Sequence, residues 1–209
     1  MAALIICITI HEFAHAYSAY RAGDDTPRRD GRISLNPLDH LDPMGTIMMV
    51  VSSISGFGIG WGKPVGINPY NFRRPRWDNL MVSLWGPLSN ILLAFVVGGV
   101  FSVLMHKTYL AGKMPSPVLS NVIGFLAMLT LINIGLAVFN LIPIPPLDGS
   151  HILSALLPFE QAKRYDHFMG QFGMFIFLGL IFAGGQILPA ILGPPRHLLW
   201  NIVTWGLPY

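Results

Sequence analysis

The chain has 209 residues, of which 53% are hydrophobic and only 11% are charged. Soluble domains carry about 25% charged residues, so the composition excludes an ordinary soluble protein and indicates an integral membrane protein with one domain over residues 1–209. The net charge of +3 comes from bases beside apolar segments, as in cytoplasmic membrane flanks, so we expect no nucleic-acid partner. The single cysteine excludes an internal disulfide and a cysteine-based metal site.

The first predicted helix runs from residue 1 to about residue 20 and contains the sequence HEFAH in an apolar setting. His11 and His15 are four residues apart and share one helix face, so both imidazoles can reach one metal ion. Glu12 is turned about 100° away, which suits contact with a metal-bound water better than metal ligation. This pattern also occurs by chance in soluble helices, but ionisable groups are costly inside a membrane helix, which favours a functional site. Because the helix carries the motif and lacks a basic leader, we expect it to be retained rather than cleaved as a signal peptide.

The region between the first helix and the next long apolar segment is polar and rich in glycine, proline and arginine. Residues 21–43 are predicted to form a loop with a short strand at 33–35, and residues 63–68 are predicted to be extended. The intervening apolar run, 44–60, is short and has basic residues on both flanks. A single crossing would place one basic flank outside, so we predict a re-entrant element that lines the approach to the metal from the cytoplasmic side.

The rest of the chain contains further apolar segments, at 79–105, 118–141, 168–183 and 187–205. The predicted fold is an all-α polytopic membrane protein. It is a helical bundle of about five or six membrane segments with a small membrane-associated β or re-entrant element. We expect a catalytic core over about residues 1–160, followed by C-terminal membrane segments over about residues 165–209.

A metal ion held by two histidines needs a third protein ligand from another segment. Asp148 is the best candidate, because it follows a proline-broken helix in a Leu-Asp-Gly triplet. Asp-Gly is also a common turn pair, but the unfilled ligand position favours a metal ligand. Asn90 and Asn140 are candidates to bind a substrate backbone or an oxyanion; hydrogen bonding between helices is the equally weighted alternative.

These residues suit zinc-dependent hydrolysis, with one Zn²⁺ per chain. Zinc lowers the pKa of a bound water to about 7. Glu12 would take the proton from that water and later pass it to the leaving amine. The remaining histidines, including His40 and His151, are interpreted as structural or interfacial.

The histidine motif and a distant second motif together resemble the site-2 protease family of intramembrane zinc metalloproteases. The second motif, N-x-x-P-x-x-x-L-D-G, consists here of Asn140, Pro143, Leu147, Asp148 and Gly149. Residues 31–37, 62–65 and 86–90 also resemble short prokaryotic members, and the resemblance extends over about residues 5–160. It implies that His11, His15 and Asp148 bind zinc and that Glu12 is the catalytic base. It also implies that membrane-inserted strands present the substrate in extended form.

The sequence therefore predicts a zinc-dependent intramembrane endopeptidase that cleaves transmembrane segments of single-span membrane proteins. We expect it in the lipid bilayer of a prokaryotic cell membrane, with its active site toward the cytoplasmic side. The alternatives are a zinc-binding transporter that performs no hydrolysis and an inactive scaffold. Glu12 favours the hydrolase, because a site that only binds zinc has no need of a carboxylate beside its first histidine.

Overall fold

The computed structural model describes residues 1–55, 60–110, 112, 114–182, 185 and 187–207. Over these residues the chain is predominantly helical and forms no β-strand, which confirms the all-α class. The helices are α1 (Ala2–Ala22), α2 (Thr26–Arg29), α3 (Pro43–Ser55), α4 (Pro75–Leu110), α5 (Pro117–Asn140), α6 (Asp148–Leu156), α7 (Phe159–Phe182) and α8 (Ile187–Val203). Two short 3-10 helices, η1 (Pro37–Asp39) and η2 (Pro69–Asn71), lie in the connections.

Four of the described helices, α1, α4, α5 and α7, are long and apolar enough to cross a membrane. The chain is therefore a multi-pass membrane protein. The other two apolar segments form α3, with 13 residues, and α8, with 17 residues. At 1.5 Å per residue these helices are about 20 and 26 Å long, whereas the hydrocarbon layer is about 30 Å thick. The expected five or six membrane segments thus comprise four full-length helices and two shorter ones.

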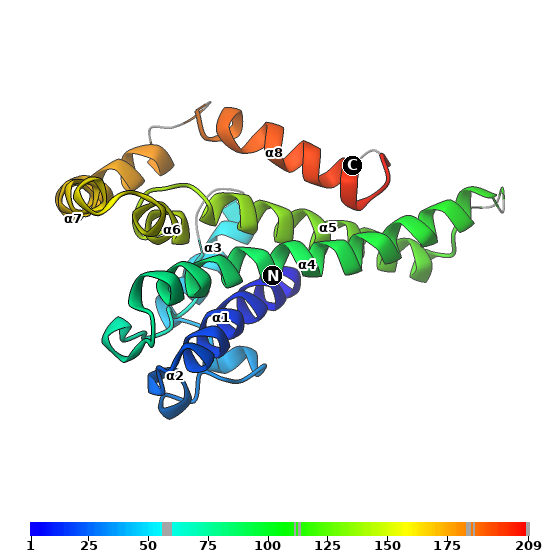
Figure 1. Cartoon of the computed structure of the whole chain (residues 1–209). Helices are drawn as coiled ribbons and strands as arrows, with labels where there is room; N and C mark the ends of the chain where they lie inside the picture. Colours follow the sequence, from blue (N-terminus) through cyan, green and yellow to red (C-terminus); the bar gives the residue numbers. More distant parts are fainter. Residues whose placement is uncertain (56–59, 111, 113, 183–184, 186, 208–209) are drawn as a thin grey trace.

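A long hairpin of α4 and α5 forms the centre of the molecule (Figure 1). The zinc-motif helix α1 packs against the N-terminal half of α4, and α8 packs along α5. Trp200 of α8 is buried against Phe101 of α4, with ring centroids 5.7 Å apart. In a soluble protein, burial of one such aromatic side chain contributes about 1.5–3 kcal/mol to stability. In lipid, the stabilisation comes mainly from close packing between the helices.

The segment that contains α3 leaves the bundle and returns to the same place. Leu41 and Gly62 form an isolated antiparallel bridge, and the Lys63 N–H donates a hydrogen bond of 2.8 Å to the His40 carbonyl. The chain before α3 and the chain after it are therefore held side by side. Such a closed segment has both ends at one level, which supports the prediction that it is re-entrant; part of that run, residues 56–59, lies outside the described residues.

The predicted strand at residues 33–35 is wrong, because this stretch forms a loop with local hydrogen bonds. The Asn36 N–H donates to Ser34 Oγ at 3.0 Å, and Asn36 Oδ1 accepts from the Leu38 N–H at 3.3 Å. Side chains of this type bond their own backbone and so compete with strand pairing. The predicted extended stretch, 63–68, is non-helical, but beyond the bridge at Gly62 it forms no ladder with another described segment.

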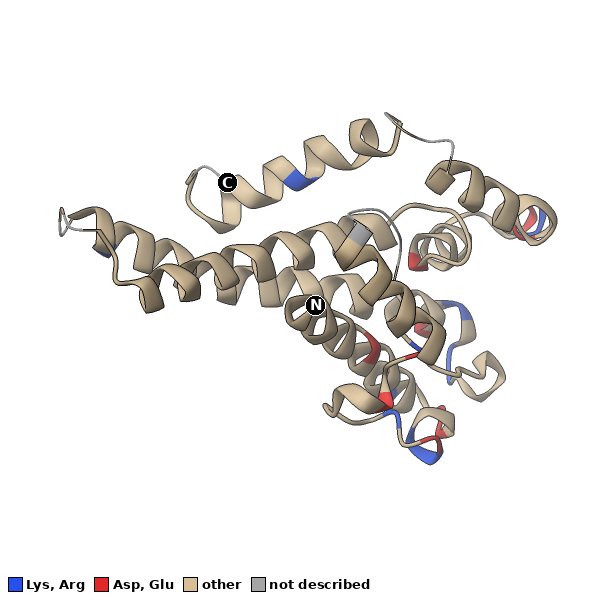
Figure 2. Cartoon of the chain, turned by 180° about the vertical axis from the view of Figure 1, so that it is seen from behind, with Lys and Arg blue, Asp and Glu red and all other residues tan. Residues whose placement is uncertain are grey.

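Charged side chains gather at one end of the molecule, as Figure 2 shows. They lie on the loops after α1, at the start of α4, and around α6 and the start of α7. The long arms of α4 and α5 carry few charges toward their far tip. This distribution is that of a membrane protein with one strongly charged face at the bilayer surface.

Candidate metal centre

The two histidines of the first motif lie side by side in the core. His11 is 6% exposed and His15 is 7% exposed, and their Nε2 atoms are 3.0 Å apart. Their rings are nearly perpendicular, at 83°, with centroids 4.6 Å apart. The four-residue spacing on α1 therefore places both Nε2 atoms at one point, as the sequence predicted.

The hydrogen bonds of the other ring nitrogens show that Nδ1 of each imidazole carries a proton. His15 Nδ1 lies 2.8 Å from the carbonyl oxygen of Val82, which can only accept, so Nδ1 carries the proton. His11 Nδ1 lies 2.7 Å from Asn90 Oδ1, and the Asn90 amide nitrogen already donates to the Cys7 carbonyl at 3.1 Å. His11 Nδ1 is therefore also the donor. With the proton on Nδ1, each neutral ring presents the lone pair of Nε2 toward the same point, where both atoms can bind one cation.

Asp148 completes this group from a distant part of the chain. Its carboxylate oxygens lie 3.2 Å from His11 Nε2 and 3.2 Å from His15 Nε2. One of them, Oδ2, is buried and accepts no hydrogen bond. An ionised carboxylate and two imidazole lone pairs within 4.8 Å of one another fit a zinc site with an open fourth position.

Two contacts hold α6 where Asp148 can reach the histidines. Arg76 of α4 donates from Nε to the Ala155 carbonyl at 2.7 Å and from a terminal nitrogen to the Leu157 carbonyl. The Tyr165 hydroxyl of α7 donates to the Pro143 carbonyl at 2.9 Å. Asp148 is the first residue of α6, where a negative side chain is favoured by the helix dipole.

Gly86 allows α4 to pass directly beneath the two imidazoles. A Cβ atom at this position would collide with the His15 ring and would lie 2.8 Å from His11 Cε1. Only a residue without a side chain lets the backbone approach so closely. The sequence showed the Gly-Pro-Leu-Ser-Asn stretch as part of the resemblance, but nothing in it identified Gly86 as a wall of the metal site.

Glu12 lines a cleft of about 360 Å³ together with both histidines and Asp148. The other walls come from the extended segment, from α4 and from the second motif, and they comprise Pro64, Val65, Ile67, Pro69, Asn79, Val82, Ser83, Asn140, Pro146 and His151. Apolar side chains from residues 64–69 and polar groups from α1, α4 and α6 both line this cleft. His151 was interpreted as structural, yet it lines this cleft; its place three residues after Asp148, on the same helix face, is the signal that could have indicated it.

Arg32 is buried beside Glu12 and joins it to the returning chain. Its side chain is 4% exposed, and one terminal nitrogen lies 3.9 Å from Glu12 Oε2. The guanidinium donates to the Pro64 carbonyl at 2.9 Å and to the Lys63 carbonyl. A buried arginine is expensive to leave without a partner for its charge. Sequence analysis included Arg32 in the predicted loop, 21–43, and in the stretch 31–37 that carries the resemblance, but gave it no role in the site.

The two asparagines occupy different environments. Asn140 lines the cleft, and its amide nitrogen donates to the Leu136 carbonyl at 3.0 Å. Asn90 is fully buried behind His11, and it also donates to Asn133 Oδ1 of α5 at 2.9 Å. Asn90 therefore makes hydrogen bonds between helices, which was the alternative to substrate binding. It orients the His11 ring and does not line the cleft.

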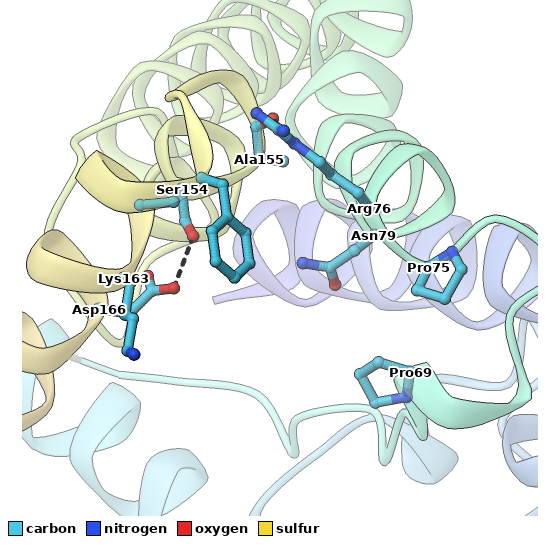
Figure 3. Close-up of a pocket in the computed structure, with 10 residues that line it drawn as sticks. Pro69, Pro75, Arg76, Asn79, Ser154, Ala155, Lys163 and Asp166 are labelled. Carbon is cyan, nitrogen blue, oxygen red and sulfur yellow. Dashed lines mark hydrogen bonds between the residues drawn. The ribbon is translucent and has the colours of Figure 1, made fainter.

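A second cavity of about 470 Å³ adjoins the metal cleft and shares Pro69 and Asn79 with it. In Figure 3, Asn79 and Arg76 project from α4 toward the α6–α7 region, and Pro69 lies across the opening. Ser154 donates a hydrogen bond of 2.9 Å to Asp166 on the far wall. The metal cleft therefore continues toward the charged end of the molecule.

Comparisons with known proteins identify the family of the chain. A model of peptidase family M50 matches residues 70–183. The chain is 38% identical over 209 residues to YwhC of Bacillus subtilis, a protein provisionally named a zinc metalloprotease, and the match covers 96% of this chain and 89% of YwhC. It is 30% identical to Rip2 of Mycolicibacterium smegmatis and 33% identical to Rip2 of Mycobacterium tuberculosis, which bear the same provisional description; each match covers 71% of this chain and 53% of the relative. No solved structure matches the chain. The chain belongs to peptidase family M50, the site-2 protease family, and is a membrane metalloprotease of that family.

Proposed function

We propose that this metalloprotease holds one Zn²⁺ with His11, His15 and Asp148 and cleaves peptide bonds within transmembrane segments of other proteins. One observation carries the proposal. Two imidazole lone pairs and an orphaned carboxylate oxygen converge in a cleft that also contains Glu12. The names of the relatives, as zinc metalloproteases, support zinc as the ion.

Each of these residues has a separate role in the proposed reaction. Zinc in this site would activate a water molecule and polarise the scissile carbonyl. Glu12 takes the proton of the attacking water and then delivers it to the leaving amine nitrogen. Asn140, which lines the same cleft, donates a hydrogen bond to the substrate backbone. Asn90 and the Val82 carbonyl keep both imidazoles in the tautomer that presents Nε2 to the metal.

The substrate lies in the cleft as an extended strand. Helical peptide bonds are hydrogen-bonded and shielded, so a transmembrane helix must unwind before it is cleaved. The non-helical stretch at residues 63–68 lines the cleft and provides backbone groups for strand addition. Such pairing satisfies the substrate backbone where no water is available.

The substrates are single-span proteins of a bacterial membrane, and the site opens toward the cytoplasm. The charged end of the molecule carries most of its arginines and lysines, and basic loops face the cytoplasm in most membrane proteins. The metal cleft continues toward this same end. The organisms of the relatives, which are bacteria, support this location.

Purified protein in detergent, incubated with a panel of single-span substrates with and without a zinc chelator, tests the proposal. Glu12→Gln should retain zinc by elemental analysis and lose about 10²–10⁴-fold in cleavage rate, because it preserves the shape of the side chain and removes the proton acceptor. Asp148→Ala should lose zinc and activity together. Zinc binding without cleavage of any substrate would instead favour a transporter or scaffold, and full zinc retention by Asp148→Ala would remove this residue from the site.

A further inference from the structure

A cavity of about 780 Å³ lies between α1 and the N-terminal part of α4, away from the metal cleft. Phe13, Tyr17 and Arg21 line it on the side of α1. Arg74, Asp78 and Trp85 line it on the side of α4. We call it the α1–α4 groove. It shares none of its lining residues with the metal cleft, so the two are separate cavities.

The groove is polar at one end and apolar along the rest of its length. Arg21 is in the last turn of α1, and Arg74 directly precedes α4. The two arginines flank a backbone hydrogen bond of 3.2 Å from the Arg73 N–H to the Ala22 carbonyl, so they belong to the same end. From Arg21 to Ile10 the groove follows α1 for 11 residues, or about 16 Å at 1.5 Å per residue.

The charges at the polar end favour an anion. The carboxylate of Asp78 accepts the Arg74 backbone N–H at 2.7 Å and lies 3.7 Å from its guanidinium, so Asp78 offsets one of the two positive charges. Among the residues that the structure describes, Arg21 forms no ion pair within 4 Å. The two arginines and Asp78 that line this end therefore leave one net positive charge, which Arg21 supplies.

The apolar part of the groove is lined by aromatic and aliphatic side chains that remain exposed in the bundle. Trp77 and Trp85 are 51% and 43% exposed. Phe13 and Tyr17 stack with ring centroids 5.8 Å apart and form a continuous aromatic strip along α1. Tryptophan and tyrosine near arginines are typical of the interface between headgroups and acyl chains.

We propose that the α1–α4 groove binds an anionic phospholipid, with the phosphate at Arg21 and Arg74 and one acyl chain along Phe13 and Trp85. A lipid combines one anionic end with a long apolar body, as the groove combines one cationic end with a long apolar wall. Basic side chains at this level attract the anionic headgroups of the cytoplasmic leaflet. This site is independent of peptide cleavage, since it lies outside the metal cleft.

Fluorescence quenching of the full-length protein in nanodiscs tests the assignment. The discs contain phosphatidylglycerol or phosphatidylcholine with identical brominated acyl chains, at equal mole fraction in an unbrominated background. Brominated phosphatidylglycerol should quench more strongly than brominated phosphatidylcholine, and Trp85→Phe should remove most of that difference. Each arginine near the membrane surface contributes about a fivefold preference at low salt, so Arg21→Gln should reduce the preference for phosphatidylglycerol about fivefold.

The matched control is Arg29→Gln, because Arg29 is an exposed arginine at the same end of the molecule that pairs with Asp25 at 3.0 Å and lies outside the groove. It should keep the full preference for phosphatidylglycerol. Equal quenching by both lipids in the wild-type protein would show only non-selective annular lipid and would overturn the proposal. An equal loss of preference in Arg29→Gln would do the same, because it would indicate diffuse electrostatics. Displacement of the brominated lipid by a single-span peptide would reassign the groove to peptides.

Discussion

Replacement of the buried Arg32 by glutamine should destabilise the segment around α3, because this side chain holds the returning chain. The guanidinium is buried and donates to the carbonyls of Lys63 and Pro64, at the point where the chain returns from α3. It also lies 3.9 Å from the Glu12 carboxylate. Glutamine is too short to reach all of these groups at once, so it would leave buried acceptors without donors.

The size of the effect follows from these contacts. A hydrogen bond from a charged donor contributes about 1.5–3 kcal/mol, so two such bonds give about 3–6 kcal/mol. Arg32 Nε is buried without a hydrogen-bond partner, which lowers the stability of the wild-type protein. The glutamine variant lacks this nitrogen and so avoids that loss. The ion pair with Glu12 is long and contributes less than a close buried pair. We therefore expect a loss of about 3 kcal/mol in the free energy of unfolding, or roughly 6–12 °C in melting temperature.

Unfolding can be followed through the single cysteine of the chain. Cys7 is fully buried on α1, so a thiol-reactive dye reports its exposure as the protein unfolds on heating in detergent. Arg29→Gln is the control, since its exposed pair with Asp25 contributes only about 0.3–0.5 kcal/mol. If Arg32→Gln melts at the same temperature as Arg29→Gln, the arginine does not hold the returning chain and the reasoning fails.

Three further predictions concern the metal site, an acidic turn and the topology. Gly86→Ala should weaken zinc retention, because its Cβ would collide with an imidazole, whereas Gly99→Ala, which meets nothing within 4 Å, should keep zinc in elemental analysis. Burial would raise the pKa of the Asp24 carboxyl, but hydrogen bonds from the turn residues around it outweigh burial and lower this pKa. The stability that Asp24 contributes is therefore complete above about pH 4 and declines as the pH falls through its folded-state pKa. Asp24→Asn should melt at a lower temperature than the wild type at pH 6, and this difference should shrink in acid; a constant difference would contradict the linkage. In a cysteine-free background, single cysteines at Asp42 and Lys63 should both react with an impermeant reagent from the cytoplasmic side, and labelling from opposite sides would show that the run between them crosses the membrane.

The acidic turn shows how polar groups fasten the loops to the end of α1. Asp24 is fully buried and accepts hydrogen bonds from the Thr26 hydroxyl at 2.6 Å, the Asn68 N–H at 2.7 Å and the Asn71 amide at 2.8 Å. It thereby ties the extended stretch that lines the metal cleft to the helix that carries His11. Loss of this acceptor should cost roughly 1–3 kcal/mol.

The features that depend on neighbouring residues were predictable from the sequence. The four-residue spacing of His11 and His15 places both rings on one helix face whatever surrounds them. The long apolar runs predicted the helices that are long enough to cross a membrane. The basic flanks predicted a re-entrant segment around α3, and the two ends of this segment lie side by side. Asp148 was predicted as the third ligand because zinc chemistry requires one and the Leu-Asp-Gly triplet offers one. The structure places its carboxylate beside both histidines.

The features that depend on distant contacts were decided by the tertiary structure. The role of Asn90 depends on the position of His11, which is 79 residues away, and the need for glycine at residue 86 arises because α4 passes under the imidazoles of α1. Arg32 looks like an ordinary basic loop residue until the returning chain covers it. The hydropathy and spacing of a segment determine its local structure, because both depend on nearby side chains. Which atoms meet across two helices depends on how the helices pack, and that follows only from the free energy of the whole assembly.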